Sequence, residues 1–284
     1  MEFLQPSTWD EALAAKAEHP DAVPIAGGTD VMVELNFDRR RPAALLDLTR
    51  VAPLTEWGED GAVLRFGAGV TYRRIIDELG GRLPGLAMAS RTVGSPQIRN
   101  RGTVGGNLGS ASPAGDAHPP LLAAGAVVEV ASVRGTRHVP VAEFFTGPKR
   151  SVLAPDELIA AVLVPPAAGP QQFSKVGTRN AMVIAVCSFA VALDPAQSTV
   201  GTGIGSAAPT PLRAVAAEEF AAAALPWATR DPLPEPVAHR FGELVAAAAA
   251  PIDDVRGSAA YRRHALAVLA RRTLGWAWEE FTCA

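Results

Sequence analysis

The spacing of hydrophobic residues in the first part of the chain predicts two helices and several strands. One helix is expected within residues 7–20, with Ser7 or Thr8 as its N-cap, and a second is expected to begin at Thr71. Residues 119–141 predict a short helix and then two strands joined by a turn at Arg134 and Gly135. Further apolar runs predict strands at 22–25, 42–51, 62–70 and 156–164.

The pattern changes after Pro165, where a turn-rich stretch is followed by longer apolar segments. Residues 173–194 and 198–207 predict adjacent strands, and a helix between strands is the alternative. Helical periodicity follows at 213–225, 237–249 and 258–278. We therefore expect an α+β chain with two lobes, at about 1–55 and 56–170, and a C-terminal α/β domain at 171–284.

Composition and charge exclude several classes of function. The formal net charge is −3 and charges are scattered along the chain, which argues against a nucleic-acid surface. No apolar stretch reaches the roughly 20 residues that a membrane span needs. The first residues lack the basic start and apolar block of a secretory signal, so a cytoplasmic protein is expected.

Cysteine and histidine are too few and too dispersed for a metal centre. Cys187 and Cys283 are the two cysteines, which excludes a disulfide framework and an iron–sulfur cluster ligated within this chain. The five histidines form neither HxxxH nor HxH spacing. We therefore predict no metal site, and no residue stands out as a catalytic acid, base or nucleophile.

Two double-glycine segments are the candidate binding elements, at residues 24–31 ("PIAGGTDV") and 103–107 ("TVGGN"). A glycine pair lets the backbone approach a ligand closely, and successive amides can then bind an anion. Either segment alone is more often an ordinary tight turn. Two facing segments, with side-chain donors from Thr29, Thr103 and Asn107, suit a pyrophosphate. Neither GxGxxG nor GxxxxGK[ST] is present, so a Rossmann fold and a P-loop are not supported.

The ordered motifs resemble a known flavoprotein family. "IAGGTDV", "GSPQIRNRGTVGGNLGSASPAGD", "DELIAAVLVP", "GSAAPTPLRAVAAE" and "PIDDVRGSAAYRRHALAVLARR" together span almost the whole chain. They are similar to the FAD-binding medium subunit of molybdenum hydroxylases, the family of xanthine dehydrogenase and carbon monoxide dehydrogenase. The similarity is greatest to bacterial xanthine dehydrogenase-type subunits. It implies a two-lobed FAD-binding domain of the vanillyl-alcohol oxidase-like type.

The resemblance also implies site residues. Asp116 would contact the flavin ribityl chain, Ile159 would lie at the flavin ring through its backbone, and Lys175 would bind nearby. The alternatives are that Asp116 caps a helix beginning near His118, that Ile159 only fills the core, and that Lys175 is a surface charge. The residues implied at the pyrophosphate are Ile25, Ala26, Gly27, Gly28, Thr29, Asp30, Val31, Thr103, Val104, Gly105, Gly106 and Asn107.

The function implied is electron transfer within a larger complex. In the family, a large subunit with a molybdopterin cofactor hydroxylates the substrate, and two-iron two-sulfur clusters in a small subunit carry electrons to FAD. A dimer of heterotrimers, an N-heterocyclic substrate such as xanthine, and NAD, oxygen or a quinone as acceptor are expected. The alternatives are a carbon monoxide dehydrogenase medium subunit, a self-sufficient flavin oxidase, and a non-enzymatic nucleotide-binding or assembly protein.

Overall fold

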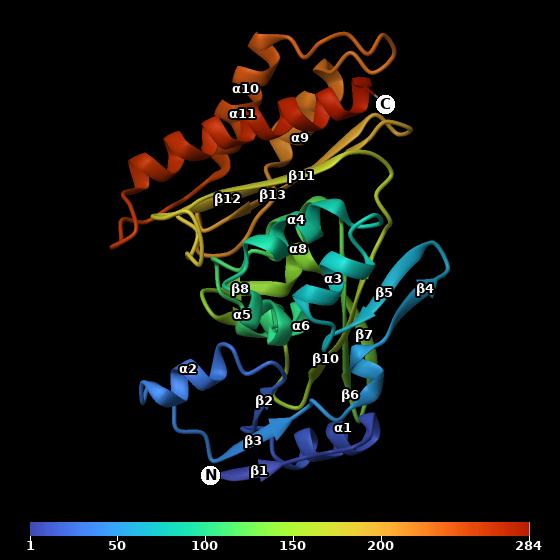
Figure 1. Cartoon of the computed structure of the whole chain (residues 1–284), viewed down its shortest axis with the longest axis vertical. Helices are drawn as coiled ribbons and strands as arrows, with labels where there is room; N and C mark the ends of the chain where they lie inside the picture. The colour runs from blue at the N-terminus through green and yellow to red at the C-terminus, as the bar shows by residue number, and fades with distance from the viewer. Residues whose placement is uncertain (284) are drawn as a thin grey trace.

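Three sheets follow one another along the long axis of the molecule (Figure 1). The structure is a computed structural model that describes residues 1–283. The first sheet contains the N-terminus and is parallel, in the order β1-β3-β2. Its strands are β1 (Glu2–Leu4), β2 (Val23–Ile25) and β3 (Ala44–Asp47), and the connections contain α1 (Trp9–Glu18) and α2 (Val31–Asn36).

Helix α1 begins where its sequence signals predict. The Thr8 side chain accepts a hydrogen bond from the Glu11 amide, and the Glu11 carboxylate accepts one from the Thr8 amide. This reciprocal capping box satisfies two amides that the first turn would leave free. The predicted Thr8 cap is confirmed.

The middle sheet is antiparallel, in the order β4-β5-β10-β6-β7. Its hydrophobic core also takes in Leu46 of β3, so the first two sheets share one apolar cluster with Phe66 and Val162. The strands are β4 (Trp57–Asp60), β5 (Val63–Gly67), β6 (Val127–Ser132), β7 (Gly135–Pro140) and β10 (Leu158–Val164). The short elements around them are η1 (Ala52–Thr55), α8 (Val141–Phe144), β8 (Phe145–Gly147) and β9 (Arg150–Ser151).

Short helices surround and form the second glycine segment. The helix predicted to begin at Thr71 is α3 (Tyr72–Glu78), and the short helix predicted within residues 119–141 is α7 (His118–Ala123). Three more helices were not predicted: α4 (Pro84–Thr92), α5 (Pro96–Arg101) and α6 (Val104–Ser110). Thr71, Ser95 and Thr103 cap α3, α5 and α6 by accepting a backbone hydrogen bond. Hydroxyl caps therefore offset the low helix propensity of glycine here.

The third sheet is antiparallel and belongs to the C-terminal part of the chain. Strands β11 (Gln171–Val176), β12 (Cys187–Asp194) and β13 (Thr199–Gly205) are adjacent in that order, as one of the two sequence interpretations predicts. Helices α9 (Val215–Ala224), α10 (Glu235–Ala248) and α11 (Ala259–Cys283) lie on one side of it (Figure 1). Phe189, Phe241 and Trp278 are fully buried between the sheet and these helices.

The other side of this sheet packs directly on helix α7. Gly201, Gly203 and Gly205 occupy alternate positions of β13 and therefore face the same way. A Cβ atom at Gly203 would lie 2.0 Å from the Pro119 carbonyl oxygen, and one at Gly201 would lie 2.0 Å from that of Ala123. Glycine at these positions lets the backbone of β13 touch the backbone of α7.

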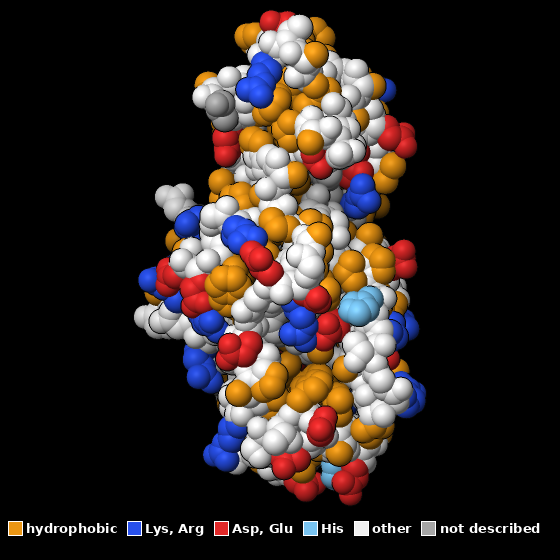
Figure 2. Space-filling model, turned by 90° about the vertical axis from the view of Figure 1, so that its right-hand side faces the viewer, with side chains coloured by type: hydrophobic (Ala, Val, Ile, Leu, Met, Phe, Trp, Pro, Cys, Tyr) orange, Lys and Arg blue, Asp and Glu red, His pale blue; other side chains and the backbone are white. Residues whose placement is uncertain are grey.

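The surface has no extended field of one charge on the face in Figure 2. Basic and acidic side chains are interspersed there with hydrophobic ones. Within residues 1–283 the structure contains no helix with the length and apolarity to cross a membrane. The same residues contain no group of three or more His, Cys, Asp or Glu side chains placed to hold a metal ion.

Candidate cofactor-binding site

The first double-glycine segment is a true loop between β2 and α2. Among residues 1–283, no hydrogen bond uses the backbone amides of Gly27, Gly28, Thr29 or Asp30 as its donor. Gly28 has a φ of +75°, a conformation that L side chains rarely adopt. Four successive unpaired amides in such a loop form a concave group of donors that fits an anion.

The residues just before the second segment touch the first segment. A Cβ atom on Gly27 would lie 1.9 Å from the carbonyl oxygen of Arg101 and 3.0 Å from the amide nitrogen of Gly102. A Cβ atom on Gly102 would in turn lie 3.5 Å from the Thr29 hydroxyl oxygen. The first segment is therefore in backbone contact with the two residues that precede the second segment.

The structure corrects the expected role of the second segment's amides. Residues 103–107 are the N-cap and first turn of α6, not an open turn. The Gly105 amide donates to the Ala68 carbonyl (3.1 Å), and the Gly106 amide donates to the Thr103 hydroxyl (2.9 Å). Because these donors are already paired, the first loop supplies most of the free amides.

Gly105 and Gly106 have different surroundings. A Cβ atom on Gly105 would lie 2.4 Å from Ala68 Cβ, so this glycine is needed for packing. Gly106 is exposed, and a Cβ atom there would meet a single neighbour, the Thr103 hydroxyl oxygen at 3.0 Å. Gly106 therefore leaves open the space in front of the helix.

Asp116 and Lys175 form a buried ion pair between the two parts of the chain. Lys175 Nζ, on β11, lies 2.5 Å from Asp116 Oδ2, and the two side chains are 8% and 9% exposed. The same Nζ donates to the carbonyl oxygens of Thr92 (3.0 Å) and Val183 (3.2 Å). Burial raises the pKa of Asp116, although the Lys175 ammonium and the Thr92 hydroxyl act in the opposite direction.

Neither simple alternative for these two residues fits the structure. The N-cap of α7 is Ala117, which makes no side-chain capping bond, so Asp116 does not cap that helix. Lys175 is nearly fully buried and is not a surface charge. The sequence analysis missed Thr92, whose hydroxyl donates to Asp116 Oδ2 at 3.2 Å.

Ile159 lies at an irregularity near the start of β10. The register of β10 against β6 shifts between Ile159 and Ala161, and a Cβ atom on Gly109 of α6 would be 3.8 Å from Ile159 Cδ1.

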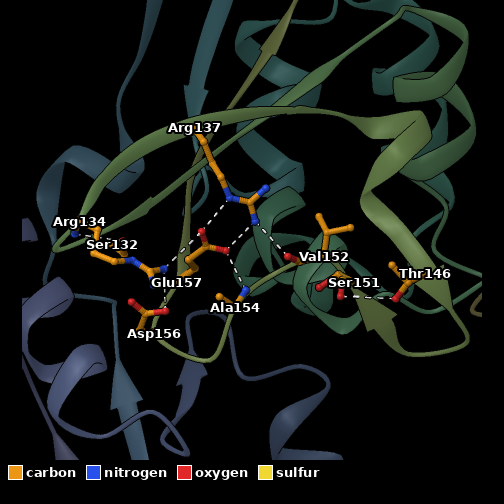
Figure 3. Close-up of polar contacts among 9 residues, drawn as sticks. All are labelled: Ser132, Arg134, Arg137, Thr146, Ser151, Val152, Ala154, Asp156 and Glu157. Atoms are coloured by element: carbon orange, nitrogen blue, oxygen red, sulfur yellow. Dashed lines mark hydrogen bonds and ion pairs between the residues drawn. The ribbon is translucent and has the colours of Figure 1, made fainter.

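Figure 3 shows the hydrogen bonds that fix the turn before β10. The Glu157 carboxylate accepts two hydrogen bonds from Arg137 of β7, both 2.7 Å, and one from the Ala154 amide at 2.8 Å.

Several buried polar atoms beside the two segments have no partner within residues 1–283. They are Tyr72 Oη, Asn107 Oδ1, Asp116 Oδ1 and His118 Nδ1. Buried polar atoms are nearly always hydrogen-bonded in folded proteins. A ligand with both hydroxyl donors and phosphate acceptors would match this mixture, so the residues present fit a flavin dinucleotide. Tyr72 is absent from the sequence-based site, because no local motif marks it.

Family comparisons agree with this geometry. Residues 1–167 match the family model for the FAD binding domain in molybdopterin dehydrogenase. Residues 172–277 match that for the CO dehydrogenase flavoprotein C-terminal domain. The chain belongs to the FAD-binding subunits of the molybdenum hydroxylases.

Relatives of this FAD subunit match it over nearly their whole length. The xanthine dehydrogenase FAD-binding subunit of Escherichia coli is 32% identical, covering 96% of this chain and 94% of its own. The nicotine 6-hydroxylase medium subunit of Paenarthrobacter nicotinovorans is 31% identical, with 96% and 95% covered. The solved carbon monoxide dehydrogenase of Hydrogenophaga pseudoflava contains a chain that superimposes with a TM-score of 0.90 at 27% identity, covering 99% and 98%.

A cleft of about 530 Å³ opens in the FAD subunit beside the Asp116–Lys175 pair. It lies between the α4–α5 region and β11 with the loop that follows it. Its lining includes four cations and, within residues 1–283, no carboxylate. The cations are Arg91, Arg99, Lys175 and Arg179.

His118 is a structural residue of the FAD subunit. Its ring is fully buried, packs on Phe145 with centroids 4.6 Å apart, and places Nε2 3.2 Å from the Asn107 carbonyl oxygen. Burial lowers the pKa of His118 from 6.5 to about 4. The ring is therefore neutral at neutral pH and supports the second segment.

This pKa predicts a loss of stability in acid. The unfolded chain takes up a proton at His118 below about pH 6.5, whereas the folded chain resists it until about pH 4. At about pH 5 the free energy of unfolding should fall by about 2 kcal/mol relative to neutral pH. Urea unfolding at both pH values measures this. His118→Gln should abolish that contribution, and His264→Gln, at an exposed site on α11, should keep it.

Proposed function

We propose that the first loop binds the FAD pyrophosphate and that Asp116 binds the ribityl chain. The unpaired amides of Gly27–Asp30 carry this proposal, because two phosphate charges need several converging donors. Thr29, Thr103 and Asn107 border the same space. The unpartnered Oδ1 of Asp116 is available to accept a ribityl hydroxyl proton.

Residues farther along the chain would orient the cofactor. Lys175 holds the second carboxylate oxygen of Asp116, so that the first remains free for the ligand. Ile159, at the bulge of β10, borders α6 and would lie toward the flavin ring. When bound, FAD would supply a group that can accept single electrons and release a pair, which would link one-electron clusters to a two-electron acceptor.

We further propose that this subunit works with a large molybdenum subunit and a small iron–sulfur subunit in a cytoplasmic dimer of heterotrimers. Cys187 is buried and Cys283 exposed, and residues 1–283 contain no metal-binding cluster of side chains. Clusters and molybdenum would therefore reside on other chains. The relatives act, by name, on xanthine and nicotine, which supports an N-heterocyclic substrate.

The structural similarity to a carbon monoxide dehydrogenase keeps that enzyme as the second candidate. A self-sufficient flavin oxidase is disfavoured, because the first loop contains neither histidine nor cysteine for covalent attachment. For the acceptor, a cleft lined by Arg91, Arg99 and Arg179, in addition to the paired Lys175, favours an anionic dinucleotide such as NAD over a quinone or oxygen.

The division into domains belongs to the same proposal. We propose a vanillyl-alcohol oxidase-like FAD domain at 1–170, with lobes at about 1–55 and 56–170, and a C-terminal domain at 171–284. The separate hydrophobic clusters on either side of the α7–β13 contact support this division.

An absorption spectrum tests the proposal directly. The purified chain should show flavin bands, and acid should release all of the flavin because the first loop contains neither histidine nor cysteine for covalent attachment. Affinity purification from the source organism should recover two further subunits, one with molybdenum and one with iron. A chain that purifies alone, lacks flavin and binds none when FAD is added would contradict the proposal.

Gly106→Val gives a residue-level test. The fold should tolerate the change with a small adjustment of the Thr103 hydroxyl, but the new side chain would project into the open space before α6. Flavin content should fall close to zero while the urea midpoint changes little. Flavin absorbance per chain measures the first, and retention of full flavin by the variant would contradict the placement of the cofactor.

A further inference from the structure

Tyr72 lies at the junction of the two glycine segments. It is the first residue of α3, and its amide donates to the Gly102 carbonyl at 3.0 Å. Thr71 and Thr103 form an isolated antiparallel bridge beside it, and a Cβ atom on Gly102 would lie 3.4 Å from Tyr72 Cδ2. The ring is therefore held by the backbone immediately before the second segment.

The hydroxyl of this tyrosine is buried but unused. Tyr72 is 3% exposed, and its oxygen has no hydrogen-bond partner within residues 1–283. Burial, with smaller contributions from Asp116 and Asp30, raises the pKa of Tyr72 well above its usual range. The group therefore stays protonated and can donate a hydrogen bond.

The carboxylate of Asp116 has an unpaired acceptor that complements the unpaired donor of Tyr72. Asp116 Oδ1 is also buried and unpartnered, and it can only accept, whereas Tyr72 can donate. The Asp116 charge contributes to the raised pKa of Tyr72, so the two side chains are neighbours. An unpaired donor and an unpaired acceptor that are neighbours can both be satisfied by a ligand chain that carries hydroxyl and phosphate oxygens. Leaving both groups unpaired would be unfavourable.

We propose that the Tyr72 hydroxyl donates a hydrogen bond to an oxygen of the ribityl–diphosphate chain of bound FAD. This inference rests on the proposed function, since it takes FAD as the ligand that lies beside Tyr72 and Asp116. Tyr72 thereby acts as a cofactor-positioning residue that no glycine motif marks.

The composition of the chain allows a direct spectroscopic test. Tyr72 and Tyr261 are its two tyrosines, and Tyr261 is 49% exposed on α11. The full chain, labelled at tyrosine Cζ with the NMR-active carbon isotope, should give two signals, which Tyr261→Phe assigns. Adding FAD to the flavin-free chain should shift the Tyr72 signal and leave that of Tyr261 in place. A Tyr72 signal that does not move while flavin absorbance shows saturation would overturn the inference.

A substitution gives an independent measurement. Tyr72→Phe should raise the dissociation constant of FAD by about threefold to tenfold, the range for one hydrogen bond. The flavin-free variant should be at least as stable as the parent, because the hydroxyl makes no internal bond. Tyr261→Phe is the matched control and should leave FAD affinity unchanged. Equal affinities for the parent and Tyr72→Phe would contradict the inference.

The two proposals fail in different ways. If no flavin binds to the parent chain, the FAD proposal is wrong and the role of Tyr72 falls with it. Flavin could instead bind without moving the Tyr72 NMR signal and with equal affinity in Tyr72→Phe. In that case only the inference about Tyr72 is wrong.

Discussion

Gly27→Ala should abolish flavin binding and lower the free energy of unfolding by about 1–3 kcal/mol, the usual range for overpacking. The added Cβ atom would lie 1.9 Å from the Arg101 carbonyl oxygen, which is backbone and cannot turn aside. The first glycine segment would have to move away from Arg101 and Gly102, and its free amides would lose their position. Flavin absorbance per chain and urea unfolding measure the two effects.

Gly81→Ala is the matched control for this substitution. Gly81 is exposed, its φ is not in the left-handed region, and a Cβ atom there would meet nothing within 4 Å. It should therefore retain full flavin and near-normal stability. If Gly27→Ala behaved like this control, the close contact of Gly27 with Arg101 and Gly102 would not be needed for binding.

Lys175→Met should destabilise the folded chain by about 3–5 kcal/mol, because it leaves the buried Asp116 carboxylate without its cation. The pair joins β11 to the segment before α7, so the loss affects both the C-terminal sheet and the cofactor site. Flavin retention should fall with stability. Urea unfolding of the flavin-free chain separates the two effects.

Two further variants provide comparisons for the stability loss expected of Lys175→Met. Arg73→Met removes an exposed helix pair with Asp77 and should change stability by less than about 1 kcal/mol. Asp116→Asn combined with Lys175→Met removes both buried charges and should recover part of the loss in stability, but not flavin binding. If Lys175→Met were no more costly than Arg73→Met, the buried pair would not be a structural link.

The sequence predicted correctly those helices and strands whose ends are marked by residues within or next to the element itself. Thr8 and Thr71 cap α1 and α3 as expected, because an N-cap needs only one side chain and the amides of the next turn. The strands around Phe66 and Val162 were also predicted, since a buried strand shows as a short apolar run.

The glycine-rich region was predicted less well, although cap signals were present. Ser95 followed by Pro96 is a helix start, and Thr103 is another, but the glycines that follow argue against a helix. Only the contact of Gly105 with Ala68 explains why α6 needs glycine there. Tertiary packing therefore overrides the local preference.

The amino-acid sequence alone determined the family, the cofactor and the two glycine segments, because these depend on ordered motifs that are local in the chain. Only the tertiary structure decided how the donors are shared. It pairs the amides of Gly105 and Gly106 internally, leaves those of Gly27–Asp30 free, and joins Lys175 to Asp116 across 59 positions. These pairings depend on which residues far apart in the sequence come into contact in the fold. Burial then determines how much free energy it costs to leave a polar atom without a hydrogen bond.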